Sequence, residues 1–265
     1  MNQKISASRL SGKTVVITGG AGLIGRGFSR ACAEEGAALA ILEIDQAAGQ
    51  KLAESLIKDT NNRKIISVKC DITDEKSVKA ALKKVQQHFK RIDVLVNNAY
   101  PRNKNYGRKF EQATHKDFCE NIDAHLGGYF LVTREVVVIM KKQKTGNIIN
   151  MGSIYGFSAP KFDIYKGTNM TSTVGYSVIK GGVINFTRYL ATYLGDYNIR
   201  ANSLSPGGVF NNQPKKFIKQ YSQRVHLGKR MAKVEDLIGP FLFLASDDSR
   251  HVTGQNLVVD GGWSL

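Results

Sequence analysis

Little in this chain suggests a disulfide-stabilised, zinc-binding or membrane-spanning protein. Its 265 residues include only three cysteines, and Cys32, Cys70 and Cys119 are widely spaced with no Cys-x-x-Cys pair. An odd number at such spacing favours neither a disulfide framework nor a zinc site, so we expect no metal. The longest apolar runs are too short to cross a bilayer and are broken by charge, so we expect no membrane association. Residues 1–9 are polar and lack the apolar centre of a signal peptide, which predicts a cytoplasmic protein.

Acidic residues are also scarce. The chain has 22 Asp and Glu against 38 Lys and Arg, which gives a formal net charge of +16. Such an excess can attract nucleic acid, an anionic surface or a phosphorylated substrate. The basic residues are scattered, however, with small clusters such as residues 141–144, and no nucleic-acid-binding motif accompanies them. We therefore expect a lysine-rich solvated surface and no nucleic-acid partner, and an anionic small-molecule substrate stays open.

Internal repeats, low-complexity segments and linkers are missing as well, so we expect one domain over residues 1–265. What the chain does have is an alternation of short apolar segments with helical patterns. The predicted strands are 14–18, 38–42, 65–69, 94–96, 147–150, 200–205 and 256–259, and the predicted helices are 25–35, 47–60, 74–89, 115–142, 176–194 and 234–245. This alternation predicts an α/β Rossmann fold, a seven-stranded doubly wound parallel sheet with helices on both faces. Ligands of such sheets bind beyond the carboxyl ends of the strands.

The turn after the first predicted strand is rich in glycine. Residues 18–25 read Thr-Gly-Gly-Ala-Gly-Leu-Ile-Gly and lie between a strand and a helix. Glycines let the backbone approach a pyrophosphate closely, and the helix N-terminus adds N–H groups and a positive dipole end. In this context we favour a dinucleotide site over a plain turn. Its predicted residues are Gly19, Gly22, Leu23, Ile24 and Gly25.

Carboxylates follow the second and third predicted strands. Glu43 can hydrogen-bond both adenosine ribose hydroxyls and repel a 2′-phosphate, and no basic residue stands beside it, so we expect NAD rather than NADP. Asp45 can be only a helix cap. Asp71 can accept from the adenine amino group while the backbone N–H of Ile72 meets the ring. Helix capping by Asp71 or Thr73 is an equally good interpretation.

Tyr176 and Lys180 form a Tyr-x-x-x-Lys pair at the start of a helical run. Residues four apart lie on one helical face, one turn from each other. An ammonium there favours the tyrosinate and would lower the tyrosine pKa from its ordinary value of about 10, as a general acid/base near neutral pH needs. Such a pair alone means little, because an exposed surface pair is the simpler interpretation.

The order of these motifs along the chain resembles the short-chain dehydrogenase/reductase superfamily, from about Gly12 to Gly262. The residues that carry the resemblance are the glycine turn, Asp71, Asn97-Asn98-Ala99, Ser153, Tyr176 with Lys180, Ser205-Pro206-Gly207 and Val259-Asp260-Gly261-Gly262. Each motif is weak alone, whereas their joint order is specific.

The resemblance implies a role for each matching position. Tyr176 would exchange a proton with the substrate oxygen, Lys180 would lower the Tyr176 pKa and hold the nicotinamide ribose hydroxyls, and Ser153 would steady the substrate oxygen. Hydride would pass to or from the nicotinamide, so the protein supplies alignment and one proton. Further cofactor contacts are implied at Asn98, Ala99, Pro206, Gly207 and Val209.

Three single-residue departures from the family pattern stand out. Leu23 replaces the middle glycine of the turn and Gly22 supplies it one place earlier, a spacing typical of the larger sugar-nucleotide branch. Tyr100 replaces the last glycine of Asn-Asn-Ala-Gly, where it either shapes the cleft floor or packs. His125 aligns with an asparagine that anchors a water in the family's proton relay. It can relay protons itself or be a core histidine, and Asn121 is a weaker candidate for the asparagine role.

The fourth departure is the distance from the serine to the tyrosine. Tyr165 lies at the usual distance but is followed by Asn169 in place of lysine, so we interpret it as a decoy and Tyr176 as the catalytic residue. The extra residues 160–173 then form a loop beside the substrate, where specificity is often set. Tyr155, directly after the serine turn, is also found in sugar-nucleotide members.

Substrate loops are expected near residues 100–110, 154–175 and 207–232. The first and last are rich in amides and bases, which suits a hydroxylated, phosphorylated or carboxylated substrate, although solvated loops with no such role stay an alternative. The candidate substrate residues are Tyr100, Arg102, Tyr155, Asn211 and Gln213.

Within the superfamily the chain looks most similar to PtmA-type flagellin-modification oxidoreductases of legionaminic-acid-like nonulosonate pathways. This resemblance implies a sugar intermediate as substrate. Reduction of a 3-oxoacyl thioester or a polyol is the alternative chemistry, and a non-catalytic NAD-binding partner subunit is the alternative of another class, favoured only by His125. Family members also pair through the helices matching 115–142 and 176–194, which implies a homodimer or homotetramer.

Overall fold

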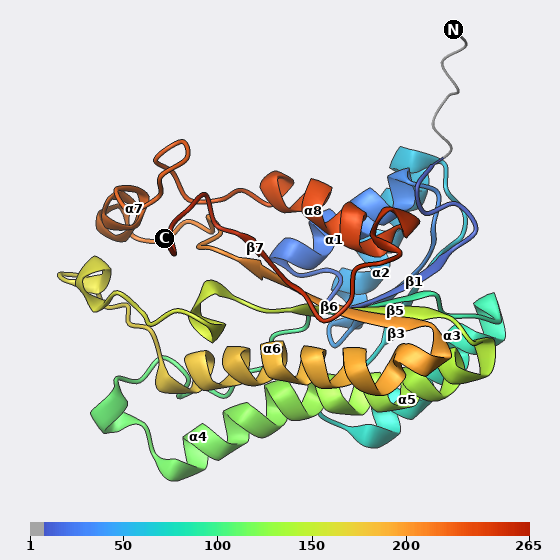
Figure 1. Ribbon diagram of the computed structural model, residues 1–265, viewed down its shortest axis with the longest axis horizontal. Helices are drawn as coiled ribbons and strands as arrows, with labels where there is room; N and C mark the ends of the chain where they lie inside the picture. The colour runs from blue at the N-terminus through green and yellow to red at the C-terminus, as the bar shows by residue number, and fades with distance from the viewer. Residues whose placement is uncertain (1–7) are drawn as a thin grey trace, which may run out of the picture.

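Seven parallel strands form one sheet in the order β3-β2-β1-β4-β5-β6-β7 (Figure 1). The computed structural model describes residues 8–265, so most of the polar segment 1–9 lies outside the described residues. The strands are β1 (Thr14–Thr18), β2 (Ala38–Glu43), β3 (Ile65–Lys69), β4 (Val94–Asn97), β5 (Gly146–Met151), β6 (Ile199–Pro206) and β7 (Asn256–Val259). The predicted doubly wound Rossmann sheet is therefore confirmed.

The order of the strands fixes where a ligand can bind. The chain runs from β1 outward to β2 and β3, then returns so that β4 pairs with the other side of β1. The connections leave β1 and β4 in opposite directions at this point, which opens a crevice at their carboxyl ends. The glycine turn after β1 and residues 98–100 after β4 both lie at that crevice.

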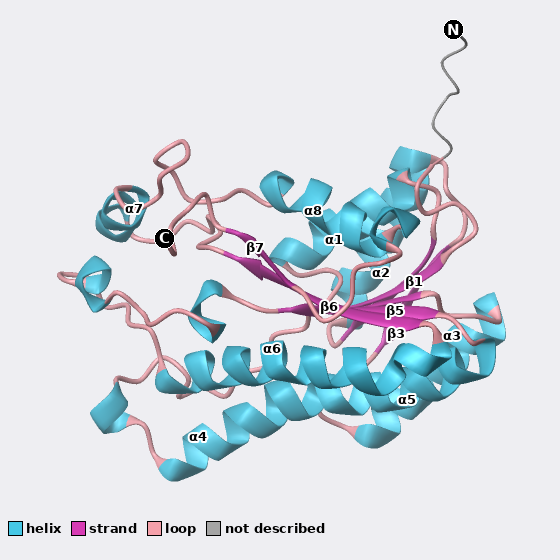
Figure 2. Cartoon of the chain, viewed as in Figure 1, coloured by secondary structure: helices cyan, strands magenta, loops and turns pink. Residues whose placement is uncertain are grey.

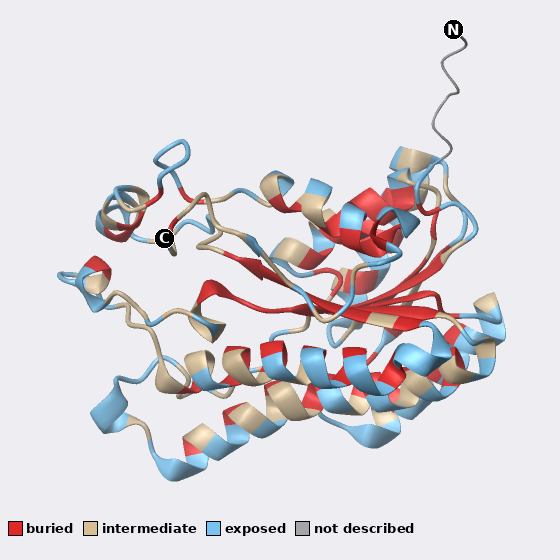
Figure 3. Ribbon diagram, viewed as in Figure 1, coloured by how far each residue is buried: buried red, intermediate tan, exposed pale blue. Residues whose placement is uncertain are grey.

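Helices cover both faces of the sheet (Figures 1 and 2). One layer contains α1 (Leu23–Glu34), α2 (Gln46–Thr60) and α8 (Glu235–Ala245), and the other contains α3 (Glu75–Phe89), α5 (Gly128–Gln143) and α6 (Val174–Leu194). Each layer buries its apolar stripe against the sheet, and α1 meets α8 through stacked Phe28 and Phe241 rings 4.1 Å apart. The inner strands β1, β4 and β5 are buried on both sides, which explains their short apolar runs, whereas the edge strands β3 and β7 are partly exposed (Figure 3). Within residues 8–265 no helix has the length and apolarity to cross a membrane.

Two helical segments differ from the sequence prediction. The helix expected over 115–142 is divided into α4 (His115–Ile122), a π-helical turn (Asp123–Gly127) and α5. Such turns are rare and occur often at functional sites, and this one contains His125. The second difference is α7 (Lys215–Ser222), inside the loop predicted to cover the substrate. Phe217 and Tyr221, one turn apart, give α7 the buried face that makes it stable.

A third apolar cluster lies beyond the carboxyl ends of the strands, apart from the two cores on the sheet. It joins Ile154 after β5, Ile164 of the inserted segment 160–173, Phe217 and Tyr221 of α7, and Trp263 of the C-terminal tail. Three segments distant in sequence therefore form one packed unit beside the crevice. We call it the lid cluster. Its buried residues are Ile154, Ile164, Phe217, Tyr221, Val225, Met231 and Trp263.

Candidate active site

Helix α6 carries the Tyr-x-x-x-Lys pair at its N-terminal end, facing the carboxyl end of β5. The helix begins where it does because the Thr173 hydroxyl accepts a hydrogen bond from the Tyr176 N–H, 3.4 Å away. Ser153 follows β5 by two residues and is buried. The Ser153 hydroxyl faces the Tyr176 phenol and opposes the rise in the Tyr176 pKa that burial causes. The structure thus brings Ser153, Tyr176 and Lys180 together, as the sequence predicted.

Lys180 lies in a nearly dry environment. Only 5% of its surface is exposed, and its Nζ donates to the Met151 carbonyl oxygen at 2.6 Å. Burial lowers the pKa of Lys180 to about 7 because the charged form loses its hydration. The same Nζ lies 5.8 Å from the centre of the Tyr176 ring. A lysine poised to gain or lose a proton near neutral pH therefore stands beside the tyrosine.

Tyr176 is partly buried among other aromatic rings. Its ring meets Tyr100 edge-on at 5.9 Å and Tyr155 at 6.3 Å between centroids. Desolvation raises the pKa of Tyr176, and the Ser153 hydroxyl opposes that rise. Our expectation that Lys180 lowers the Tyr176 pKa was wrong for the protein's own groups. Desolvation is the largest influence on the Tyr176 pKa and raises it, because burial disfavours the charged phenolate.

His125 is fully buried behind the lysine. Its Nε2 lies 3.4 Å from Lys180 Nζ, and its ring packs edge-on against Tyr100 at 5.1 Å and Tyr129 at 5.0 Å. Burial and the neighbouring Lys180 hold the His125 pKa well below its ordinary range, so the imidazole is neutral. Its Nδ1 is buried and finds no hydrogen-bond partner among residues 8–265. Asn121 instead bonds the backbone N–H of Asn103, so its amide faces the loop after β4.

The glycine turn has the shape that a dinucleotide requires. Gly19 has φ +60°, and a Cβ there would lie 2.8 Å from the Cα of Ala99. A Cβ on Gly25 would lie 2.2 Å from the Gly19 carbonyl oxygen, so the turn closes only with glycine. Helix α1 starts at Leu23 after Gly22, with no acidic residue in its first turn. Leu23, Ile24 and Gly25 thus present free N–H groups and a positive helix end, which fits a pyrophosphate.

Side chains after β1, β2 and β4 fix the turn in place. The Asn98 amide donates to the carbonyl oxygens of Thr18 and Gly19 at 3.0 and 2.9 Å. The Thr18 hydroxyl accepts from the backbone N–H groups of Asn98 and Ala99. The Glu43 carboxylate accepts from the Ala21 N–H at 3.1 Å, which places it at the edge of the turn. Glu43 therefore lies where a carboxylate would meet the adenosine ribose.

The other two predicted carboxylates, Asp45 and Asp71, have different roles, because one caps a helix and the other orders a turn. Asp45 caps α2 by accepting from the Ala48 N–H at 3.0 Å, one of the roles that we considered. Asp71 accepts from both the N–H and the hydroxyl of Thr73, which orders the turn after β3. The cap of α3 is Asp74, so neither Asp71 nor Thr73 caps that helix. Ile72 is buried beneath the same turn.

The segment after β6 joins the site to the lid cluster. The Gly207 N–H bonds the Val259 carbonyl oxygen at 2.9 Å, and the Gly208 N–H donates to the Tyr221 hydroxyl. Val209 forms a parallel bridge with Ala232. Pro206, Gly207 and Val209 are therefore held at the strand end, where the resemblance places the nicotinamide contacts.

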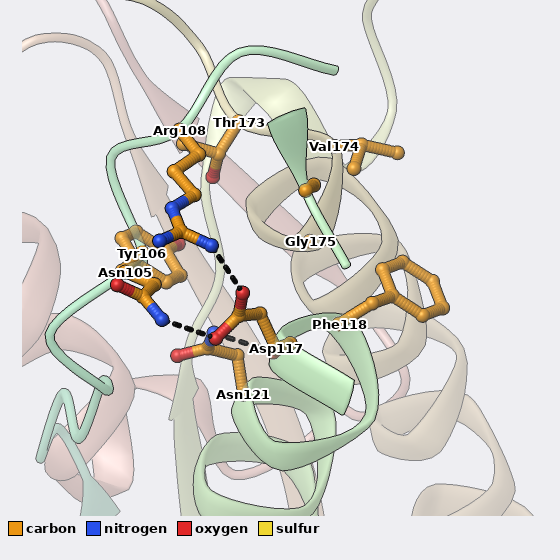
Figure 4. A pocket seen from close by; sticks show the side chains of 10 residues that line it. Asn105, Tyr106, Arg108, Asp117, Phe118, Asn121, Thr173, Val174 and Gly175 are labelled. Atoms are coloured by element: carbon orange, nitrogen blue, oxygen red, sulfur yellow. Dashed lines mark hydrogen bonds and ion pairs between the residues drawn. The ribbon is translucent and has the colours of Figure 1, made fainter. Parts of the chain in front are cut away.

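Several polar side chains in the two amide-rich loops bond within the protein. Asp117 of α4 accepts from Asn105 and Arg108 (Figure 4). It also accepts from the Asn103 amide, so three contacts fasten the loop after β4. The Gln213 amide bonds the Val209 carbonyl oxygen, and its carbonyl accepts from the Asn211 N–H. Arg102 is different, because its guanidinium lies 5.4 Å from the Tyr100 ring centre. The Arg102 guanidinium therefore lies beside Tyr100, whose ring meets that of Tyr176.

Several aromatic residues at the site escaped the sequence reading. Tyr165 was interpreted as a decoy, yet its hydroxyl lies 3.1 Å from that of Tyr155. Trp263 lies 5.7 Å from Tyr155 and stacks on Tyr221 at 5.4 Å. Tyr129 packs under His125. Of Tyr165, Trp263 and Tyr129, only Tyr165 lay in a predicted substrate loop, and no local pattern indicated that the other two reach the site.

Residues 8–265 contain no group of three or more His, Cys, Asp and Glu side chains arranged to hold a metal ion. The residues available fit an organic cofactor instead, a dinucleotide with its pyrophosphate on the glycine turn and its far end beside Tyr176 and Lys180.

Comparisons with known proteins agree with this geometry. A family model described as enoyl-(acyl carrier protein) reductase matches residues 19–264. Flagellin modification protein A of Campylobacter coli is 35% identical over 97% of this chain and 100% of its own length. A 3-oxoacyl-[acyl-carrier-protein] reductase of Thermotoga maritima is 36% identical over 96% of this chain and 98% of its own.

Solved structures give the same result. A short-chain dehydrogenase from Leptospira borgpetersenii with bound NAD+ superposes with a TM-score of 0.87 at 34% identity, covering 100% of this chain and 98% of that one. A gluconate 5-dehydrogenase from Burkholderia cenocepacia, in complex with NADP and tartrate, reaches 0.85 at 28% identity, covering 97% of each chain. The matches span nearly the whole chain, which places this protein in the short-chain dehydrogenase/reductase family of nicotinamide-dependent oxidoreductases.

Proposed function

We propose that this protein is an NAD-preferring oxidoreductase that interconverts an alcohol and a carbonyl on a sugar intermediate of a nonulosonate (legionaminic-acid-like) pathway. The observation that carries the chemistry is the meeting of Ser153, Tyr176 and a buried Lys180 at the carboxyl end of β5. A surface Tyr–Lys pair would be solvated, whereas this lysine has its charge destabilised beside the tyrosine. Such perturbed pairs are typical of proton-transfer sites.

Each residue has a part in the proposed step. As the tyrosinate, Tyr176 takes the hydroxyl proton of an alcohol substrate, and as the phenol it gives a proton to a carbonyl oxygen in the reverse direction. Ser153 donates to the same substrate oxygen and keeps it in line. Lys180 stabilises the tyrosinate when protonated and holds the ribose hydroxyls of the cofactor. The nicotinamide group supplies the hydride acceptor or donor.

His125 is proposed as a relay and positioning residue for Lys180. Its Nε2 faces Lys180 Nζ, and when that ammonium donates to Nε2 the imidazole hydrogen lies on the unpartnered Nδ1. We expect His125→Asn to keep most activity and His125→Leu to shift the pH profile of kcat as well as lower it. A fall in kcat with an unchanged profile in both variants would leave His125 with a packing role only.

The NAD preference is proposed from Glu43, which lies at the rim of the glycine turn. A carboxylate there repels the 2′-phosphate of NADP, and known relatives of this fold use either cofactor. Glu43→Gln keeps an acceptor for the Ala21 N–H and removes only the charge. We expect the ratio of kcat/KM for NAD over NADP to fall about tenfold. An unchanged ratio would contradict the proposal.

The sugar assignment is supported by the relative named as a flagellin modification protein and by Tyr100, Arg102 and Tyr155 around Tyr176. Asn211 and Gln213 are weaker candidates, since both already bond within their own loop. The alternatives stay a polyol or a 3-oxoacyl thioester, the latter because one relative carries that name.

The decisive experiment is an NAD-linked turnover screen of sugar phosphates, nucleotide sugars, polyols and acetoacetyl-CoA. Tyr176→Phe should lower kcat by about 10²- to 10⁴-fold and leave NAD affinity unchanged. If the wild type and Tyr176→Phe bind NAD but are equally inactive on every compound, the alternative of a non-catalytic NAD-binding partner subunit is the better account.

Assembly and location complete the proposal. Helices α5 and α6 expose Phe130, Tyr189 and Tyr193 on their outer face, which suits pairing as a homodimer or homotetramer. The three cysteines are free thiols, which fits a reducing cytoplasm. Light scattering at several protein concentrations would test the assembly.

A further inference from the structure

The inserted segment 160–173 returns a second tyrosine to the catalytic centre. A short 3₁₀ turn over Phe162–Tyr165 directs the Tyr165 ring toward the turn after Ser153. There the Tyr165 hydroxyl lies 3.1 Å from the hydroxyl of Tyr155. The Tyr155 ring is in edge-on contact with Tyr176, and its backbone N–H bonds the Ser153 hydroxyl at 3.2 Å. The Tyr155–Tyr165 pair is therefore in direct contact with Tyr176, the proposed proton-transfer group.

The two hydroxyls remain protonated and still have hydrogen-bonding capacity. Burial raises the pKa of both Tyr155 and Tyr165. Their mutual bond uses one hydrogen and one lone pair, and within residues 8–265 neither hydroxyl has another hydrogen-bond partner. The Ser172 hydroxyl influences the Tyr165 pKa from nearby, and its oxygen is buried without a partner. Partly buried hydroxyls with unused hydrogen-bonding capacity favour a ligand that can pair with them.

The surroundings of the pair are aromatic rather than charged. Trp263 lies 5.7 Å from the Tyr155 ring, and Phe217 of α7 lies 5.3 Å from the Tyr165 ring. A ring with C–H faces and hydroxyl edges matches aromatic walls and phenol hydroxyls at once. An acyl chain would fill the walls but leave the hydroxyls without partners, which costs binding free energy.

We propose that Tyr165 is a specificity residue that, together with Tyr155, binds hydroxyl groups of the substrate next to the reacting carbon and selects a polyhydroxylated ring over an acyl chain. This rests on the proposed oxidoreductase function and names the part of the substrate that the inserted segment recognises. Tyr176 exchanges a proton with the reacting oxygen, while the Tyr155–Tyr165 pair binds the hydroxyl groups on the neighbouring carbons.

Fluorescence of Trp263 provides a readout that does not depend on turnover. It is the only tryptophan in the chain and it touches Tyr155, so a ligand bound there should change its emission. The NAD complex would be titrated with myo-inositol and D-galactose as polyhydroxylated rings, with cyclohexanol as the matched bare ring, and with acetoacetyl-CoA as the acyl thioester.

Wild type should bind the polyhydroxylated rings in preference to cyclohexanol. Tyr165→Phe and Tyr155→Phe should each lower this preference about 5- to 10-fold, and the double variant should add little, because each change breaks the same pair. Tyr197→Phe removes the same atom from an exposed position just after α6 and should change nothing. A preference that is absent in wild type, or unchanged in both Phe variants, would overturn the proposal, as would tighter binding of acetoacetyl-CoA than of either polyhydroxylated ring.

Parallel assays separate this proposal from the proposed function. Tyr176→Phe should lose turnover yet keep the binding preference. Preference without any NAD-linked turnover would reject the oxidoreductase function and leave the hydroxyl site standing. Turnover without the preference would reject the hydroxyl site alone.

Discussion

The two halves of the active-site crevice are built by different means. At the ends of β1, β2 and β4 the surface is mainly backbone, and side chains such as Asn98 and Glu43 hold the glycine turn in shape. At the ends of β5, β6 and β7 aromatic side chains dominate, with Tyr176 among rings and the lid cluster behind it. The first half suits a constant ligand such as a dinucleotide. In the second half, substitutions among the side chains can alter which substrate fits.

The largest effect is expected from opening the lid cluster. Trp263→Ala removes a fully buried side chain that stacks on Tyr221, a loss that costs about 3–5 kcal/mol in packed cores. Hydrogen exchange of α7 amides should speed up strongly, while α1 and NAD affinity stay near wild type.

Trp263→Phe is the matched control for this change, because it keeps an aromatic ring and should recover most of the protection of α7. Equal loosening of α1 and α7 in Trp263→Ala would show that the two halves are not independent.

On the catalytic side of the crevice, the pH dependence of stability tests the burial of Lys180. Its pKa of about 7 lies below the ordinary 10.5, so between those values the unfolded chain holds a proton that the folded chain lacks. The contribution of Lys180 to stability should therefore rise with pH across this window, by on the order of a few kcal/mol. The lowered pKa of His125 puts its titration below the window. Burial raises the pKa of Cys32, Cys70 and Tyr176, so these groups oppose the rise toward the alkaline end, and the Lys180 contribution has to be measured as a difference between two variants.

Chemical unfolding of wild type and Lys180→Met at pH 7 and pH 10 measures this linkage. The free energy of unfolding of wild type, relative to that of Lys180→Met, should be larger at pH 10 than at pH 7. Parallel pH dependences would mean that Lys180 stays charged in the folded protein throughout.

Gly25→Ala tests the cofactor half. Its new Cβ would lie 2.2 Å from the Gly19 carbonyl oxygen, so the turn must open. Overpacking of this kind costs about 1–3 kcal/mol, and we expect NAD affinity to fall roughly 10- to 100-fold. Exchange of α7 amides should stay unchanged, the converse of Trp263→Ala.

Gly239→Ala in α8 is the control, since a Cβ there meets nothing within 4 Å. Calorimetric titration with NAD compares the two variants. If both bind NAD like wild type, the close approach at Gly25 is not what shapes the site.

The smallest effect is expected at the surface of the lid. Asp163 of the inserted segment pairs with Arg224 after α7, and both side chains are largely exposed. Exposed pairs contribute about 0–1 kcal/mol, so Asp163→Asn should leave the thermal midpoint and α7 exchange almost unchanged. Exchange as fast as in Trp263→Ala would show that the ion pair, rather than the aromatic packing, holds the lid.

The fold and the cofactor half could be predicted because their signals are local. Each strand is a short apolar run, and the turn at Gly19 and Gly25 is spelled out in adjacent residues. The site at Tyr176 could be placed because a helix puts Lys180 one turn away whatever surrounds it. The π-helical turn at His125 could not be predicted, because it changes the register of a helix whose apolar pattern continues through it.

The sequence by itself determined the sheet, the glycine turn and the Tyr176–Lys180 pair, since each depends on residues within one or two turns of chain. Only the tertiary structure decided the electrostatics and the substrate side. Burial, which no local pattern reveals, raised the Tyr176 pKa and lowered that of Lys180. Tyr165 and Trp263 reached the site through long-range packing of the inserted segment, α7 and the C-terminal tail. Asn169 in place of a lysine had marked Tyr165 as non-catalytic, and no local pattern indicated its contact with Tyr155, because contacts between distant segments leave no periodic trace in a sequence.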